Sequence, residues 1–147
     1  LNEKTCTSME YVKQLLQGKF PAAPKFSVMI SHVKDIAKAH VLSLTNNRAG
    51  GRRLIVGSEV RSILELSQIM AKNIPSHAKK LPKRELPNFM VKLLSYVDTS
   101  AKNMVPDLGL KMQTDQKYAE NILQMKFTAS EIAVVDAAKS VIRLNLA

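Results

Sequence analysis

Cysteine, tryptophan and long apolar runs are almost or wholly absent from this chain of 147 residues. Its single cysteine, Cys6, excludes an internal disulfide framework and a multi-cysteine zinc site. No apolar run is long enough to cross a membrane, so we expect no membrane partner. Aromatic residues make up only 5% of the chain, which leaves few of the stacking platforms that nucleic-acid domains use. We therefore expect no nucleic-acid partner either.

Acidic residues are scarce in one part of the chain only. The whole chain carries 22 Lys and Arg against 12 Asp and Glu, a net charge of +10. Residues 1–84 hold 15 basic and 5 acidic residues, net +10, whereas residues 85–147 hold 7 and 7, net zero. A basic balance of this kind is compatible with nucleic acid, with an anionic cofactor or with solubility alone.

Length and composition indicate a folded unit. Apolar residues make up 46% of the chain, which is enough to build a core, and 147 residues fit one domain or a large piece of one. The first residue is Leu rather than Met, and no apolar signal segment follows it. From this we expect a chain that was processed, cut or only partly built, and a cytoplasmic location.

Helix signals dominate the sequence. Capping boxes predict helix starts at Thr7, Ser62 and Thr128, because each hydroxyl residue is followed three places later by Glu. Asp35 and Thr114 are predicted as single N-caps. The predicted helices cover residues 7–16, 35–44, 62–74, 87–97, 114–123 and 128–142. The helix at 35–44 has an apolar surface wide enough to predict deep burial.

Two segments predict strands. Residues 26–30 form a short β-prone run, and Leu54 to Val56 form another that does not alternate polar with apolar residues. A continuous apolar run suits a strand that is buried on both faces of a parallel sheet. Because the chain has few other strands to surround it, this run indicates that part of the fold is missing.

Catalytic and metal-binding groups do not converge in the sequence. His32 lies between a strand and a helix start, where a loop side chain either faces a cleft or makes ordinary hydrogen bonds. His40 is expected in the core and His77 in solvent. No His, Asp or Glu cluster has metal-ligand spacing, so we predict no metal site. The glycines form neither a G-x-G-x-x-G fingerprint nor a P-loop.

The tyrosines and the basic loops carry no recognised motif. The residue four places after each tyrosine is Leu15, Ser100 or Ile122, so the chain has no Tyr-x-x-x-Lys pair. The connector at 79–84 contains four cations, and a turn near residue 50 contains three more. These cations could bind phosphate, or they could be plain solvated charge.

Several segments carry a family resemblance through their order and spacing. Residues 31–40, SHVKDIAKAH, resemble the H-V-x-D-[VIL]-A-x-A-H segment of the extended short-chain dehydrogenase/reductases. Residues 51–58 are similar to the G-x-R-[YF]-[IL] strand of that family, and residues 80–82 to its K-[VLY]-P connector. Residues 108–109, 114–123 and 127–128 resemble its closing segments. The branch most similar to this chain contains the dihydroflavonol-reductase-like and cinnamoyl-CoA-reductase-like enzymes.

The resemblance implies a fold and an activity. The parent fold is an α/β, NAD(P)-binding Rossmann enzyme, and this chain alone would be mostly α-helical with two or three short strands. Residues 1–147 would be the C-terminal portion with the substrate-binding region, and the N-terminal cofactor-binding half, with its Tyr-x-x-x-Lys pair and glycine fingerprint, would be absent. The parent would be an NAD(P)H-dependent oxidoreductase that reduces a carbonyl of a small dihydroflavonol-like, ketone or aldehyde substrate, and the isolated chain would be inactive.

The resemblance also implies site residues and partners. Met29, Ser31 and His32 would lie near the substrate, and Thr5 and Ser8 where the family closes over its cofactor, NADP or NAD. No catalytic residue is carried over. The expected partners are the missing N-terminal half, a small-molecule substrate and, as a possibility, a second copy of the chain.

Two alternatives remain open. A sugar-nucleotide epimerase or dehydratase, from the NAD-dependent epimerase/dehydratase family of the same superfamily, could share these segments, since fold does not settle substrate. A stand-alone basic helical binding module is the other. If the chain is part of a larger enzyme, it should expose the apolar flanks of residues 36–44 and 54–56.

Overall fold

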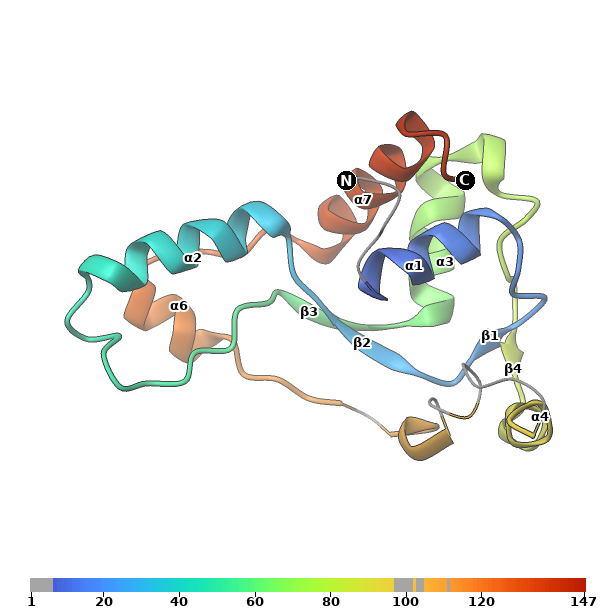
Figure 1. Cartoon of the computed structure of the whole chain (residues 1–147), viewed down its shortest axis with the longest axis horizontal. Coiled ribbons are helices and arrows are strands. Elements are labelled where there is room, and N and C mark those ends of the chain that lie inside the picture. The colour runs from blue at the N-terminus through green and yellow to red at the C-terminus, as the bar shows by residue number, and fades with distance from the viewer. Residues whose placement is uncertain (1–6, 97–101, 103–104, 111) are drawn as a thin grey trace.

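The structure is a computed structural model that describes residues 7–96, 102, 105–110 and 112–147. Its main body is a bundle of three helices: α1 (Thr7–Leu16), α3 (Ile63–Asn73) and α7 (Ser130–Arg143). Helix α7 packs against both α1 and α3 (Figure 1). Between them lies the larger core cluster, whose fully buried side chains include Leu15, Met70 and Val141.

A two-stranded antiparallel ribbon joins this bundle to the rest of the chain. Strand β2 (Ser27–Ile30) pairs with β3 (Glu59–Ser62), and Met29 stands opposite Val60. Side chains alternate between the two faces of a strand. Val28 and Ile30 pack against the larger core cluster, so the face that carries Met29 and Val60 is the one turned away from it. The strand predicted at 26–30 is confirmed.

A smaller lobe contains α2 (Val33–Thr45) and α6 (Lys117–Leu123), which lie side by side at one end of the molecule (Figure 1). Its core cluster is built on Ala39, Ile122, Leu123 and Met125. At the opposite end, β1 (Ala23–Pro24) and β4 (Glu85–Leu86) form a short parallel pair beside α4 (Asn88–Leu94). Short 3₁₀ turns, η1 (Pro75–His77) and η2 (Val105–Asp107), complete the described elements.

The fold class predicted from the sequence is confirmed. Six α-helices occur among the described residues, together with four strands, of which β1 and β4 have two residues each. None of these helices has both the length and the apolar character needed to span a membrane.

The structure confirms the capping box predicted at Ser62, whereas the caps predicted at Asp35 and Thr128 are wrong. The Ser62 hydroxyl accepts from the Glu65 N–H while the Glu65 carboxylate accepts from the Ser62 N–H, so α3 starts as predicted. Helix α2 starts two residues earlier than predicted, with His32 rather than Asp35 as its N-cap. Helix α7 has no side-chain cap, because the Thr128 side chain donates to Asp35 instead.

The remaining helix starts also differ in detail. Helix α6 is preceded by Gln116 rather than capped by Thr114. Pro87 is the N-cap position of α4 and lies just before its first turn. Helix α1 matches the predicted range 7–16, but the predicted cap side chain of Thr7 lies outside the described residues.

The prediction of a strand at Leu54 to Val56 is wrong for this chain. These residues have no strand partner and run as extended connection between α2 and β3. Leu54 and Val56 pack on the smaller core cluster, whereas the Ile55 side chain is 41% exposed. A strand needs a neighbour to accept and donate its backbone hydrogen bonds, and the described residues offer none at this position.

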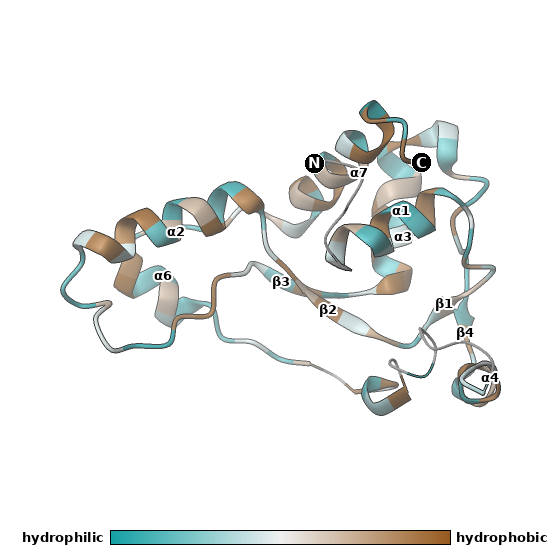
Figure 2. Cartoon of the chain, in the orientation of Figure 1, coloured by the Kyte–Doolittle hydropathy of each residue, from teal (hydrophilic) through white to brown (hydrophobic). Residues whose placement is uncertain are grey.

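Helix α2 is not deeply buried, which contradicts the burial prediction. Only Ala39 is buried, and Val41 and Leu44 are 64% and 85% exposed. His40, predicted in the core, is exposed as well, with Nδ1 2.8 Å from the Ile36 carbonyl oxygen. Figure 2 shows hydrophobic positions recurring along α2. The other sequence prediction, that residues 36–44 and 54–56 expose apolar flanks, is therefore confirmed.

Candidate functional site

Two of the predicted substrate-facing residues, Met29 and Ser31, converge on a glycine. Gly57 is buried, and a β-carbon added to it would lie 2.7 Å from Met29 Sδ and 2.9 Å from Ser31 Oγ. Real β-carbons essentially never approach other heavy atoms this closely. Gly57 therefore provides the space in which the Met29 and Ser31 side chains meet.

Hydrogen bonds hold the end of β2 against the segment that contains Gly57. The Ser31 hydroxyl donates to the Val56 carbonyl oxygen over 2.7 Å. In return, the Ser58 N–H donates to the Ile30 carbonyl oxygen over 2.9 Å, and the Ser58 hydroxyl lies 3.2 Å from the same oxygen. These bonds link residues 30–31 to residues 56–58 on both sides of Gly57, so the position of Met29 is fixed by backbone as well as by packing.

His32 is buried, and both of its ring nitrogens have partners. Nδ1 accepts from the Lys34 N–H over 3.2 Å, which caps α2, and Nε2 lies 3.4 Å from Asp136 Oδ2 on α7. Accepting at Nδ1 leaves the proton on Nε2, where it can be donated to Asp136. In this arrangement His32 positions the junction between β2 and α2, and it has no ring nitrogen left to bind a substrate directly.

A depression of 370 Å³ lies beside β3. On one side it is lined by the segment from Ser58 to Val60, and on the other by Met112, Gln113, Thr114 and Gln116. Val60 stands opposite Met29 in the ribbon, and residues directly opposite each other in an antiparallel pair place their side chains on the same face. The depression therefore borders Val60, the cross-strand neighbour of the predicted substrate-facing residue Met29, although Met29 itself does not line it.

An ionic network fixes Glu59 at the border of this depression. Arg61 donates to Glu59 over 2.8 Å, to Glu65 over 3.2 Å and to the Ser130 hydroxyl over 3.0 Å, and Ser130 in turn donates to Glu59. The hydrogen bond from Ser130, followed by that from Arg61, lowers the pKa of Glu59. The pKa of Glu65 is lowered mainly by the Ser62 N–H, and that of Arg61 is raised mainly by Glu59. The network ties β3 to the first turns of α3 and α7.

Of the two predicted cofactor-binding residues, only Ser8 belongs to the described part of the chain, and it does not line the depression. Thr5 lies outside the described residues, and Ser8 is exposed in the first turn of α1. Among the described residues, no group of three His, Cys, Asp or Glu side chains is placed to hold a metal ion.

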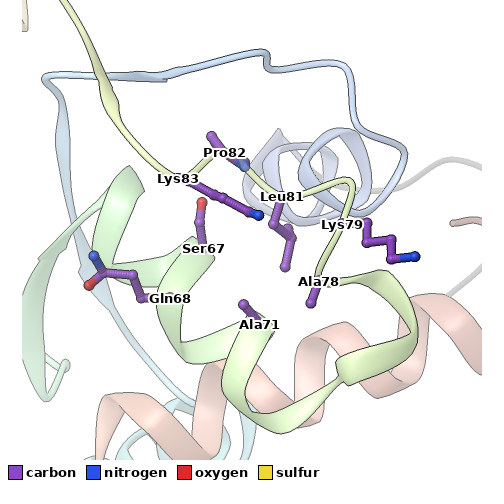
Figure 3. Close-up of a pocket in the computed structure, with 8 residues that line it drawn as sticks. All are labelled: Ser67, Gln68, Ala71, Ala78, Lys79, Leu81, Pro82 and Lys83. Atoms are coloured by element: carbon purple, nitrogen blue, oxygen red, sulfur yellow. The ribbon is translucent and has the colours of Figure 1, made fainter.

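The basic connector forms a separate feature. Residues 78–83 cover a hollow of 270 Å³ against α3, with Leu81 and Ala71 on its apolar floor (Figure 3). In Figure 3 the Lys83 side chain lies across the hollow, whereas Lys79 points away from it. Neither lysine forms an ion pair with a described acidic residue, and the connector lies at the end of the molecule opposite α2. This hollow shares no residue with the depression beside β3.

Comparison with known proteins identifies the fold. No protein-family model and no curated protein sequence matches the chain. A solved reductase engineered to attenuate substrate inhibition in asymmetric catalysis is similar over 97% of this chain and 38% of its own, with 25% identity and a TM-score of 0.70. The yeast methylglyoxal/isovaleraldehyde reductase Gre2, solved with NADPH, shares 20% identity over 92% of this chain and 40% of its own, with a TM-score of 0.68. Gre2 from Candida albicans shares 20% identity over 99% and 39%, with a TM-score of 0.71.

The chain thus has the fold of part of an extended short-chain dehydrogenase/reductase, as the sequence resemblance implied. It spans about two fifths of the length of these solved structures. Gre2 from yeast and from Candida albicans was solved with NADPH bound, so an NADP-type cofactor is confirmed for reductases of this fold.

Sequence reasoning does not find several residues of the site. The sequence pattern indicates only a turn at Gly57, and Thr114 is predicted only as the N-cap of a helix over 114–123, with no role in a site. One signal could have found Gly57: it follows an extended apolar run directly and precedes a capped helix by few residues, where a close backbone approach is a common reason for glycine. Nothing in the sequence places residues 112–116 beside Val60, because that contact joins segments more than fifty residues apart.

Proposed function

We propose that this chain is the C-terminal, substrate-facing portion of an NADPH-dependent reductase of small carbonyl compounds. The observation that carries the proposal is the match of almost the whole chain to part of a solved reductase at 25% identity and a TM-score of 0.70. The yeast protein with the same fold is named for two small aldehydes, methylglyoxal and isovaleraldehyde, and is solved with NADPH.

The residues present indicate which steps of the reaction belong to this chain and which belong to the cofactor-binding portion. NADPH, when bound, supplies the hydride, and its site belongs to the cofactor-binding portion that completes the enzyme. The 147 residues contain no Tyr-x-x-x-Lys pair, so proton transfer also belongs to that portion. This chain contributes the ribbon face with Met29, which closes over the substrate and excludes water from it. His32 and Ser31 hold that face in position through Asp136 and Val56.

The cofactor-binding portion is proposed to dock on the exposed apolar face of α2. Val41 and Leu44 on α2, together with Ile55, are large apolar side chains left in solvent. Large apolar side chains that gather on an exposed surface are typical of an interaction site. Covering α2 and the adjacent segment at 54–56 with further strands would also supply the backbone partners that this segment lacks.

The test is an assay of NADPH oxidation by the full-length polypeptide that contains this chain, with methylglyoxal, isovaleraldehyde and simple ketones as substrates. We expect turnover with at least one neutral carbonyl and none from the 147 residues alone. Full-length protein that binds NADPH but turns over no carbonyl would contradict the proposal, and so would turnover by the isolated chain.

A second measurement tests the role of the ribbon face. Met29→Ala should raise KM for the carbonyl several-fold and leave the Kd of NADPH unchanged, because Met29 lies on the substrate side. Ile132→Ala, on the exposed surface of α7, is the matched control. If Met29→Ala instead weakened NADPH binding and left KM unaltered, the assignment of Met29 to the substrate side would be wrong.

A further inference from the structure

The depression beside β3 combines apolar walls with polar side chains that have no protein partner in the described part of the chain. Val60 and Met112 provide the apolar surface. The side chains of Gln113, Thr114 and Gln116 line the same space, and none of them makes a hydrogen bond to another described residue. Three adjacent polar groups that are left unpaired at a concave surface are available for a ligand.

The chemistry of these groups restricts the ligand. Each glutamine amide offers two N–H donors and one acceptor, and the threonine hydroxyl can donate or accept. Such groups pair with a neutral oxygen, such as a carbonyl or hydroxyl, without requiring a charge on the ligand. Thioether side chains such as that of Met112 adapt to ligands of different shape, so the walls accept a small alkyl group as well.

The charge of the depression disfavours anionic ligands. Among the described residues that line it, none is Lys or Arg, and one is the acidic Glu59. Arg61, the nearest cation in the network, is held by Glu59, Glu65 and Ser130. Phosphates and carboxylates are recognised mainly by cations and by charge-assisted hydrogen bonds. A nucleoside diphosphate or an α-keto acid therefore finds no counter-charge among the described residues that line the depression.

We propose that the depression is a subsite for the oxygen-bearing substituent of a neutral carbonyl substrate, with Gln113, Thr114 and Gln116 as its hydrogen-bonding groups. The inference rests on the proposed function and names the substrate class: neutral α-dicarbonyl or hydroxycarbonyl compounds, ahead of simple alkyl aldehydes. The depression adjoins Val60, which stands opposite Met29, so a substrate in contact with Met29 can extend its substituent into this space.

The test compares three substrates in the full-length polypeptide. Methylglyoxal carries a second neutral carbonyl, isovaleraldehyde carries a branched alkyl group in its place, and pyruvate carries a carboxylate. In the Gln113→Leu/Gln116→Leu double variant we expect kcat/KM for methylglyoxal to fall about tenfold and that for isovaleraldehyde to change less than about twofold, because only the former loses hydrogen bonds. The unaltered protein should reduce pyruvate far less efficiently than methylglyoxal.

The control is Gln68→Leu, which makes the same chemical change in the separate hollow beside α3 and should alter neither substrate. If the double variant does not fold, as judged by its thermal unfolding, the single variant Gln113→Ser takes its place, with the same selectivity shift expected. Equal effects on both aldehydes, no effect on either, or efficient reduction of pyruvate would overturn the subsite while leaving the reductase assignment intact. A full-length protein that reduces none of the tested carbonyl compounds with NADPH would overturn both the subsite and the reductase assignment.

Discussion

The carboxylate of Asp35 accepts two hydrogen bonds from Thr128, a residue 93 positions away in the sequence. The Thr128 N–H donates to Oδ2 over 2.6 Å and its hydroxyl to Oδ1 over 3.1 Å. Asp35 lies in the first turn of α2, and Thr128 lies just before α7. This pair therefore connects the smaller lobe to the start of the last helix of the bundle.

Replacing Asp35 should destabilise the chain through loss of this connection. Hydrogen bonds to a charged group contribute about 1.5–3 kcal/mol, so we expect Asp35→Ala to lower the free energy of unfolding by about 2 kcal/mol in urea titrations. Asp107→Ala removes an exposed carboxylate that makes no hydrogen bond to a described residue and is the control. Equal stability of the two variants would show that the Asp35–Thr128 pair contributes nothing.

Adding a methyl group at Gly57 should displace Met29. Its β-carbon would lie 2.7 Å from Met29 Sδ, and inserting a methyl group into such a space costs about 1–3 kcal/mol. We expect Gly57→Ala to destabilise the chain toward the lower end of this range, since the Met29 side chain is flexible. In a Met29→Ala background the same substitution should cost less. A double-mutant cycle measured by urea unfolding gives the coupling directly, and additive effects would count against the contact.

Substitutions of His32 should separate its two roles. His32→Ala removes the cap of α2 and should cost about 1 kcal/mol of stability. Asn is among the best N-cap residues, so His32→Asn should recover most of that loss although it breaks the contact with Asp136. Thermal unfolding followed by circular dichroism gives the order of stability. If His32→Asn were as unstable as His32→Ala, the contact with Asp136 rather than the cap would be the main contribution of His32.

The network around Arg61 predicts a stability that falls at acid pH. The pKa of Glu59 and that of Glu65 are lowered in the folded chain. A carboxyl group whose pKa is lowered by folding contributes stability that is present above its unfolded pKa and is lost as pH falls through the folded pKa. The effect should be modest, because both side chains are more than 40% exposed and their ion pairs are screened by solvent.

Glu59→Gln provides the measurement for this network. The free energy of unfolding of the variant should change less between neutral and acid pH than that of the unaltered chain, since one of the two carboxyl groups of this network whose pKa is lowered no longer titrates. Urea titrations at several pH values give both curves. A variant that kept the full pH dependence would show that Glu59 does not contribute to it.

The exposed face of α2 should make the isolated chain associate. Val41 and Leu44 present two large apolar side chains one turn apart, and burial of such surface drives association. We expect self-association of residues 1–147 in sedimentation experiments and its loss in the Val41→Lys/Leu44→Lys variant. Ile132→Lys, at an exposed apolar position on α7, should not have this effect. An isolated chain that is monomeric at all concentrations would remove the argument for a docking face on α2.

Most elements could be predicted from the sequence where the signal is local. The Ser62 capping box places the start of α3 correctly because both of its partners lie within four residues. The strand predicted at residues 26–30 likewise follows from β-prone residues at neighbouring positions. The family resemblance of residues 31–40 and the segments that follow them predicts the fold class correctly, since it depends only on the order and spacing of residues along the chain.

The failures share a different cause. Thr128 has the pattern of a capping box, yet its hydroxyl is engaged by Asp35, a competitor that the local sequence does not contain. The run from Leu54 to Val56 has the composition of a strand, yet the described residues provide no neighbour for it. In both cases the local preference is real and a distant partner, present or absent, decides whether it is expressed.

By itself the sequence determined the helical composition, the absence of a Tyr-x-x-x-Lys pair and the segment that resembles extended short-chain dehydrogenase/reductases. The tertiary structure decided which of these residues share a site. It brought Gly57 against Met29 and Ser31 and set residues 112–116 beside Val60. It also gave both ring nitrogens of His32 a structural partner. Composition and periodicity record what each residue prefers over a few positions, whereas a site depends on contacts between distant segments that form only when the chain folds.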